Sequence, residues 1–486
     1  MPANNLAKPS IIADIAGKKF AQRSFLLIAS QLIRLAAQLS IIFIYARHLS
    51  YKDYGLYQSV WLYVNVISIL SLFGLPSLIL STPQKNIFKW IKENGNHFFI
   101  IAVALNLLPL IFLLAVIHEF DITERFLIVV LIVIQNISII TETITIKKEK
   151  ETLVLVANII FTIGYFICHL FVLYTGYSLQ LLLTGLIVVF IVKTIILFFF
   201  SKQQQEHPLD IHLIKTGTQW FYLGLVDLLG VLFKWLDKWL ILFFLSVSQF
   251  AIYFNGAYEI PVFGLMLGAV GNIMLIELSK HRHDTFEQNK TLFINSSLLL
   301  ASVVFPSFAF LLFYHHDFFT LIFSAKYTVS IPIFFISIFI LPVRITNYTA
   351  ALQVYHRNDL IVKGALLDIV VAILLMAILY PLLQMRGLAL AFVLSTYVQA
   401  WYYLWQTSRL VKEKISVFFP IKELIIIMGI SIVVMAITFF IFNRSTYPFG
   451  MIGGIVICSL LIALLVFFYL KKDGFIITGN NKKQLN

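Results

Sequence analysis

Residues 24–57 read SFLLIASQLIRLAAQLSIIFIYARHLSYKDYGLY. The first 23 of them are apolar and numerous enough to cross a bilayer as a helix. Arg34 lies near the middle of this span, and Gln31 and Gln38 lie on the same helix face. An arginine at the hydrocarbon midplane costs about 2.5–3.5 kcal/mol on insertion scales, so it normally faces protein or water. We therefore interpret this helix as one wall of a polar cavity inside a membrane protein.

The composition extends the membrane interpretation to the whole chain. Of the 486 residues, 60% are hydrophobic and 12% are charged, and the apolar stretches run from end to end. Cys168 and Cys458 both fall inside apolar stretches, so they indicate neither a disulfide framework nor a metal site. The formal charge of +13 comes from basic residues in short loops, which is typical of membrane topology rather than of nucleic-acid binding.

Fourteen apolar spans are predicted, with only short connections between them. They run approximately over 24–46, 54–80, 98–117, 126–146, 152–174, 179–200, 216–244, 250–276, 291–314, 331–353, 361–383, 387–407, 422–442 and 450–470. If the N-terminus is inside, 25 of the 36 Lys and Arg residues lie in or beside inside segments and 6 lie in outside loops. This asymmetry predicts that both termini are cytoplasmic.

A short internal repeat predicts how the spans are arranged. LSYKDYGLY at 49–57 aligns without a gap on LSVSQFAIY at 245–253. Each copy follows one span and opens the next, and six spans separate the copies, so both have the same orientation. The predicted fold is an all-α polytopic membrane protein with two six-helix lobes related by a pseudo-twofold axis along the membrane normal. The predicted segments are a cytoplasmic amphipathic lead-in (1–23), the first lobe (24–200), a linker (201–215), the second lobe (216–407), a cytoplasmic loop (408–421), two extra spans (422–470) and a cytoplasmic tail (471–486).

The repeat also relates polar faces in the two lobes. Shifting the first copy by 196 residues onto the second also places the polar face around Arg34 on a polar face of span 216–244, which includes Asp227 and Lys234. The following spans add Glu259 and Arg344. The candidate substrate-binding residues are Arg34, Gln31, Gln38, Lys234 and Arg344, and the candidates for coupling-ion binding are Asp227 and Glu259.

Each of these assignments has an alternative. Arg34 either anchors a phosphate, which suits its planar fork of donors, or forms a structural ion pair with Asp227 or Glu259. The two carboxylates either bind a proton or sodium ion or simply neutralise the arginines. Other charged residues lie near predicted interfaces, and there we expect solvated or snorkelling side chains. These residues are Glu142, Lys193, Lys238 and Asp368.

Several stretches resemble polysaccharide biosynthesis flippases of the multidrug/oligosaccharidyl-lipid/polysaccharide exporter superfamily. They are YARHLSYKDYGLYQSVW (45–61), LFGLP (72–76), DKWLILFFLSVSQFAIYFNGAYEIP (237–261), LIFSAKYTVSIPIF (321–334) and MRGLALAFVLS (385–395). The resemblance implies two six-helix lobes around a central cavity, which is cationic in members that move lipid-linked oligosaccharides. It also suggests a role for spans 13 and 14, because the two extra helices of lipid II flippases border a lipid-tail groove.

The function implied by the resemblance is a flippase for an undecaprenyl-pyrophosphate-linked oligosaccharide, such as a unit of O-antigen, capsule or another exopolysaccharide. It would act by alternating access in the bacterial inner membrane. We expect no cofactor and no nucleic acid, and the energy source would be a proton or sodium gradient. The expected partners are the lipid-linked substrate, membrane lipids, a polysaccharide polymerase and a chain-length regulator.

Two other function classes are considered. A multidrug or other small-molecule exporter of the same superfamily would favour acidic cavity residues, whereas the first span carries Arg34 and no acid. A polytopic membrane enzyme of polysaccharide assembly would need a substantial loop for its site, and the predicted connections are short. The sequence also lacks the phosphate-binding motif GxxxxGK[ST], which argues against ATP-driven transport by this chain alone. We therefore predict a transporter rather than an enzyme.

Overall fold

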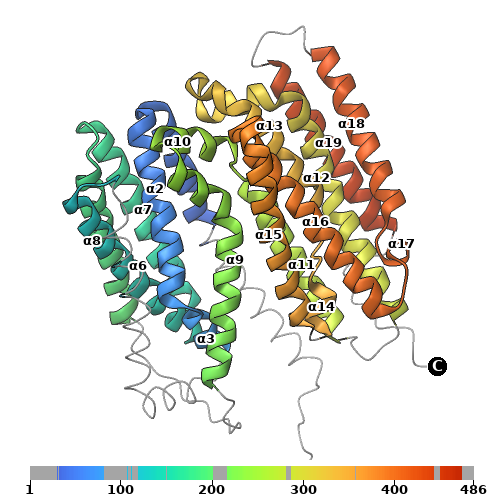
Figure 1. Ribbon diagram of the computed structural model, residues 1–486, viewed down its shortest axis with the longest axis horizontal. Coiled ribbons are helices and arrows are strands. Elements are labelled where there is room, and N and C mark those ends of the chain that lie inside the picture. Colours follow the sequence, from blue (N-terminus) through green and yellow to red (C-terminus); the bar gives the residue numbers. More distant parts are fainter. Residues whose placement is uncertain are drawn as a thin grey trace, which may run out of the picture. The chain divides into compact units, whose positions relative to one another are not determined.

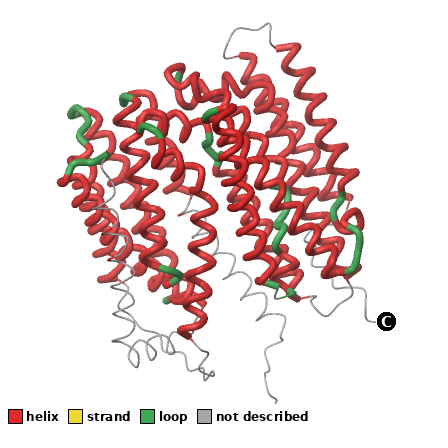
Figure 2. The backbone as a smooth tube through the Cα atoms, in the orientation of Figure 1, coloured by secondary structure: helices red, strands yellow, loops and turns green. Residues whose placement is uncertain are grey.

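The computed structural model describes residues 30, 32–81, 107, 111, 119–148, 150–200, 216–280, 286–355, 357–442 and 449–472. These residues form helices and no strand (Figure 2). Among the described residues, ten helical stretches are long and apolar enough to cross a membrane, or up to eleven if one bent pair is a single span. The all-α polytopic membrane fold is thus confirmed.

Other sequence predictions remain untested. The amphipathic lead-in, the linker and most of the tail lie outside the described residues, as does most of span 98–117. The total of fourteen spans and the cytoplasmic location of both termini therefore stay predictions.

The helices form two compact units (Figure 1). Unit 1 comprises Met1–Trp235 and Leu245–Ala251, and unit 2 comprises Leu236–Phe244 and Ile252–Asn486. The division falls inside α9 (Thr216–Phe244), which contributes residues to both units. The lobe limits predicted at 200 and 216 stay a prediction.

Unit 1 is built around α6. Its helices are a helix over 32–48, α2 (Tyr51–Leu72), α3 (Leu75–Ser81), α6 (Ile122–Lys147), α7 (Glu151–Tyr174), α8 (Leu179–Phe200) and the first part of α9. α6 packs against α2, α3, α7 and α8. It begins with a capping box, in which the Asp121 side chain accepts from the Glu124 N–H and the Glu124 side chain accepts from the Asp121 N–H.

Two lysines of unit 1 satisfy helix ends. Lys147 Nζ donates to the Leu80 carbonyl oxygen at 2.7 Å, and Lys150 Nζ donates to that of Phe200 at 3.1 Å. These carbonyls belong to the last turns of α3 and α8, where helix geometry leaves acceptors unpaired and the helix dipole favours a cation. The basic residues that predict topology therefore also cap helices.

Unit 2 is built around the long helix α12. Its elements are the end of α9, the second half of α10 (Val247–Gly256), α11 (Pro261–Lys280), α12 (Phe286–Phe323), η1 (Ala325–Ser330), α13 (Ile331–Ser337), η2 (Ile338–Val343), α14 (Ala350–Val354), α15 (Asn358–Leu383), α16 (Met385–Val411), α17 (Ile415–Phe418), α18 (Ile421–Phe442) and α19 (Phe449–Lys472). The extra C-terminal helices α18 and α19 pack against α12, and α15 packs along α16.

Two predicted spans of unit 2 are interrupted. α10 and the start of α11 differ in direction by 55° across a short break. The span predicted over 331–353 is a series of short 3₁₀ and α pieces rather than one helix. Pro332 and Pro342 contribute to this because proline lacks the N–H of a regular helix. Membrane proteins tolerate such backbone where it is covered by protein or lines a cavity.

The internal repeat corresponds to one local structure used twice. Ser50 Oγ accepts from the Asp53 N–H at 3.0 Å at the start of α2, and Ser246 Oγ accepts from the Gln249 N–H at 3.3 Å at the start of α10. The matched serines are therefore N-caps. The matched final tyrosines, Tyr57 and Tyr253, are both buried. The pseudo-twofold relation of the lobes stays a prediction.

Candidate functional site

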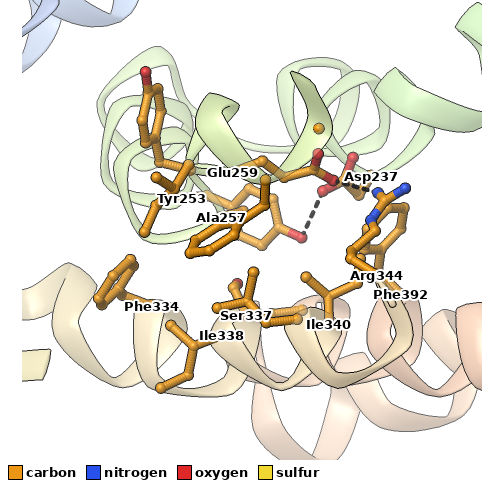
Figure 3. A pocket seen from close by; sticks show the side chains of 16 residues that line it. Asp237, Tyr253, Ala257, Glu259, Phe334, Ser337, Ile338, Ile340, Arg344 and Phe392 are labelled. Atoms are coloured by element: carbon orange, nitrogen blue, oxygen red, sulfur yellow. Dashed lines mark hydrogen bonds and ion pairs between the residues drawn. The ribbon is translucent and has the colours of Figure 1, made fainter. Parts of the chain in front are cut away.

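A pocket in unit 2 is bordered by the break between α10 and α11, by η2 and by the start of α16 (Figure 3). Its volume is about 700 Å³, including the space at its open mouth. Apolar and aromatic side chains form most of its wall, and its charged residues are Asp237, Glu259 and Arg344. A largely apolar hollow with a few convergent polar groups is the usual composition of a small-molecule site.

Irregular backbone positions an ion pair in this pocket. Arg344 Nη2 donates to Glu259 Oε1 at 3.2 Å (Figure 3). Glu259 lies in the non-helical stretch 258–260, and Arg344 directly follows the proline-containing η2. The side chains are 43% and 31% exposed, so both keep access to a ligand. The structure thus brings together two residues that the sequence singled out separately.

Asp237 forms a second polar contact in the pocket. Its Oδ2 accepts a hydrogen bond from the Tyr253 hydroxyl at 3.0 Å (Figure 3) and lies 3.2 Å from Lys238 Nζ. The Lys238 nitrogen also lies 5.9 Å from the ring centroid of Phe392. Lys238 is buried, so the expectation that it snorkels is wrong. Sequence reasoning missed Asp237, although an adjacent acid and base inside an apolar span are a usable signal.

Unit 1 contains the predicted phosphate anchor. Arg34 and Gln38 are half-buried on the helix over 32–48, and Gln31 lies outside the described residues. Arg34 interacts electrostatically with Glu142 on α6 and Lys193 on α8. The arginine is therefore within electrostatic range of a carboxylate that the sequence did not assign to it.

Glu142 and Lys193 form a buried ion pair. Lys193 Nζ lies 2.7 Å from Glu142 Oε2, with side-chain exposures of 3% and 10% respectively. Asn158 Nδ2 donates to Glu142 Oε1 at 3.1 Å. Asp368 on α15 is fully buried as well. The expectation of solvated or snorkelling side chains is wrong for these three charged residues, because the surrounding protein buries them.

The polar face of α9 contacts α3 and the break that precedes it. Asp227 accepts from Ser77 Oγ at 3.2 Å, and Trp220 Nε1 donates to the Phe73 carbonyl oxygen at 2.7 Å. Both contacts lie within unit 1. Lys234 lies further along α9, and its side chain is outside the described part of the chain.

Comparison with known proteins gives a family and a fold. A family profile described as "Polysaccharide biosynthesis protein" matches residues 44–332. No curated protein sequence matches the chain. Among solved structures, the lipid II flippase MurJ in an inward closed conformation is similar with a TM-score of 0.65 at 17% identity, over 92% of this chain and 99% of that chain.

Two further solved structures share the fold. A multidrug resistance MATE family transporter of the MOP superfamily, in an inward-facing conformation, has a TM-score of 0.55 at 12% identity, over 79% of this chain and 98% of that chain. A MOP superfamily transporter from Pyrococcus furiosus has a TM-score of 0.54 at 13% identity, over 82% of this chain and 97% of that chain. At these identities the similarity concerns the fold.

Proposed function

The chain belongs to the polysaccharide biosynthesis protein family, and from this premise we propose that it is a flippase for an undecaprenyl-pyrophosphate-linked oligosaccharide. It moves a unit of O-antigen, capsule or another exopolysaccharide across the bacterial inner membrane by alternating access. The carbohydrate polymerase and chain-length regulator of the same process are its proposed partners. The fold shared with a lipid II flippase supports this proposal.

Arg34 is the observation that carries the proposal. A cationic fork inside an apolar span is costly unless it serves a ligand or an internal partner. A pyrophosphate linkage offers oxygens that match the guanidinium donors in pairs. Gln31, Gln38 and Lys234 are proposed to assist on their own helices.

The pocket of unit 2 offers a second arginine. Arg344 pairs with Glu259 at 3.2 Å, and Arg344, like Arg34, is only half-buried. We assign Arg344 to substrate binding as well. Asp227 and Glu259 are the proposed groups for coupling to a proton or sodium gradient.

Complementation of a flippase-deficient bacterial strain tests the proposal. Arg34→Ala is expected to abolish complementation while the amount of inserted protein stays normal. Arg34→Lys should restore it only in part, because lysine keeps the charge and loses the planar fork. Arg47→Ala is the matched control, since Arg47 is an exposed arginine on the same helix, and it should complement fully. Full complementation by Arg34→Ala would contradict the assignment.

A further inference from the structure

One face of α16 changes from apolar to basic along the helix. Its apolar members are exposed and recur every three or four residues, so they share one helix face. They are Leu394, Val398, Trp401 and Trp405. Arg409 continues the same spacing and is exposed as well. An exposed face of this composition on a membrane-spanning helix suits lipid tails along its apolar part and lipid headgroups at its charged end.

The length of α16 places this charged end in the headgroup layer. The helix has 27 residues, and at about 1.5 Å per residue it is about 40 Å long. The hydrocarbon core of a bilayer is about 30 Å thick, so about 10 Å of the helix extends beyond it. Tryptophan and tyrosine are typical of the membrane interface, and Trp401, Tyr402 and Trp405 are grouped in the two turns before Arg409. Arg409 therefore lies at the depth of lipid phosphates.

The Arg409 guanidinium lies over an aromatic ring. Its Cζ atom is 3.8 Å from the centroid of the Trp405 ring. A guanidinium in this position uses its face for the ring, while its N–H donors point outward in its own plane. Among the described residues, no carboxylate or carbonyl accepts a hydrogen bond from these donors. The ring thus orients a fork of donors that an external acceptor can use.

An arginine at the start of α15 shows which acceptor fits such a fork. Arg357 Nε and Nη2 donate to the two carboxylate oxygens of Asp359 at 2.9 and 3.0 Å. A phosphate offers the same pair of neighbouring, negatively charged oxygens. The difference is that Arg357 has its acceptor within the protein, whereas Arg409 faces the headgroup layer.

The residues after Arg409 favour an anionic ligand. Residues 409–414 read RLVKEK and contain three cations and one acid. Lys412, Glu413 and Lys414 are all exposed, so their charges act on the same headgroup layer. Basic residues beside a membrane-spanning helix attract anionic lipids, and a net positive segment repels the ammonium group of a zwitterionic lipid.

We propose that the C-terminal end of α16 binds the phosphate of an anionic phospholipid. Arg409 donates to two phosphate oxygens, Trp405 holds the guanidinium in place, and the acyl chains lie along the apolar part of the same face. The site lies in unit 2 and involves neither Arg34 nor the pocket. The inference therefore does not depend on the proposed function.

Native mass spectrometry of the purified full-length protein tests the inference. The protein is titrated in detergent with phosphatidylglycerol or with phosphatidylcholine, and the lipids bound per protein are counted. Arg409→Gln should bind one phosphatidylglycerol fewer than the wild type at the same lipid concentration. Trp405→Leu should weaken binding of that lipid about two- to fivefold, because it keeps an apolar side chain and removes the ring. Both residues are exposed, so the melting temperatures should stay near that of wild type.

Arg386→Gln is the matched control. Arg386 is an exposed arginine at the other end of α16, and no described aromatic ring lies against its guanidinium. The change removes the same charge from the same helix, and the protein should bind as many phosphatidylglycerols as the wild type. An equal loss for Arg386→Gln and Arg409→Gln would reveal unspecific charge attraction and overturn the inference.

Three further results would also overturn it. The first is an equal number of bound phosphatidylglycerols for wild type and Arg409→Gln. The second is equal binding of phosphatidylcholine and phosphatidylglycerol at the Arg409-dependent site. The third is binding of inorganic pyrophosphate that depends on Arg409, together with phosphatidylglycerol binding that does not, since the site would then serve a phosphate other than that of a membrane lipid.

Discussion

At the scale of single residues, three of the described cations each lie against a carboxylate. Lys193 lies against Glu142, Lys238 against Asp237, and Arg344 against Glu259. The first pair is buried and the last is partly exposed. Breaking a buried pair leaves an uncompensated charge, whereas an exposed pair contributes little because solvent screens it. Burial therefore decides which pair the fold depends on.

The comparison of Lys193→Ala with Arg344→Ala tests this difference. Lys193→Ala should lower the free energy of unfolding by about 3–5 kcal/mol, because Glu142 stays buried and charged. Arg344→Ala should cost about 0–1 kcal/mol, since the Glu259 side chain is 43% exposed. Reversible unfolding in mixed detergent micelles measures both. Equal destabilisation by the two changes would contradict the account.

At the scale of elements, the breaks between helices position the polar groups. The break between α2 and α3 consists of Phe73 and Gly74, with φ of 36° and 75°. At this break the Phe73 carbonyl oxygen accepts a hydrogen bond from the Trp220 indole N–H. Gly74 also packs directly on the backbone of Gly224, where a Cβ atom would collide. Glycine is thus required here both by conformation and by space.

Gly74→Ala should therefore be strongly destabilising. The positive φ alone costs about 1–3 kcal/mol for a residue with a side chain, and the collision with Gly224 adds to it. Gly429→Ala in α18 is the matched control, because a Cβ atom there meets open space. The melting temperature of the detergent-solubilised protein should fall for the first change and stay near that of wild type for the second. Similar melting temperatures would show that the close approach is dispensable.

At the scale of the whole molecule, the sequence predicts the membrane class and the local repeat correctly. Hydropathy and the matching stretches 49–57 and 245–253 are signals that a linear sequence carries. Ion pairs between side chains of different helices cannot be predicted from such signals. Glu142 and Lys193 are 51 residues apart, and only the packing of α6 on α8 brings them together. Closeness to a predicted membrane interface therefore did not predict solvation for Glu142, Lys193 or Asp368.

Topology is predicted by the asymmetry of basic residues. Reporter fusions after Lys92, Lys150 and Lys472 should read cytoplasmic, and fusions after Glu124 and Ser445 should read periplasmic. Alkaline phosphatase and fluorescent protein fusions, which are active on opposite sides, measure this directly. A C-terminus outside the cytoplasm would contradict both the fourteen spans and the shared orientation of the repeats.

Movement of the lipid-linked substrate tests the central claim most directly. Purified protein is reconstituted in liposomes that contain an undecaprenyl-pyrophosphate-linked oligosaccharide, and the fraction in the outer leaflet is followed with an impermeant, sugar-modifying enzyme. The account predicts that the wild type makes the inner-leaflet pool accessible, that Arg34→Ala does not, and that Arg47→Ala behaves like the wild type. Equal rates in wild-type, Arg34→Ala and protein-free liposomes would contradict it.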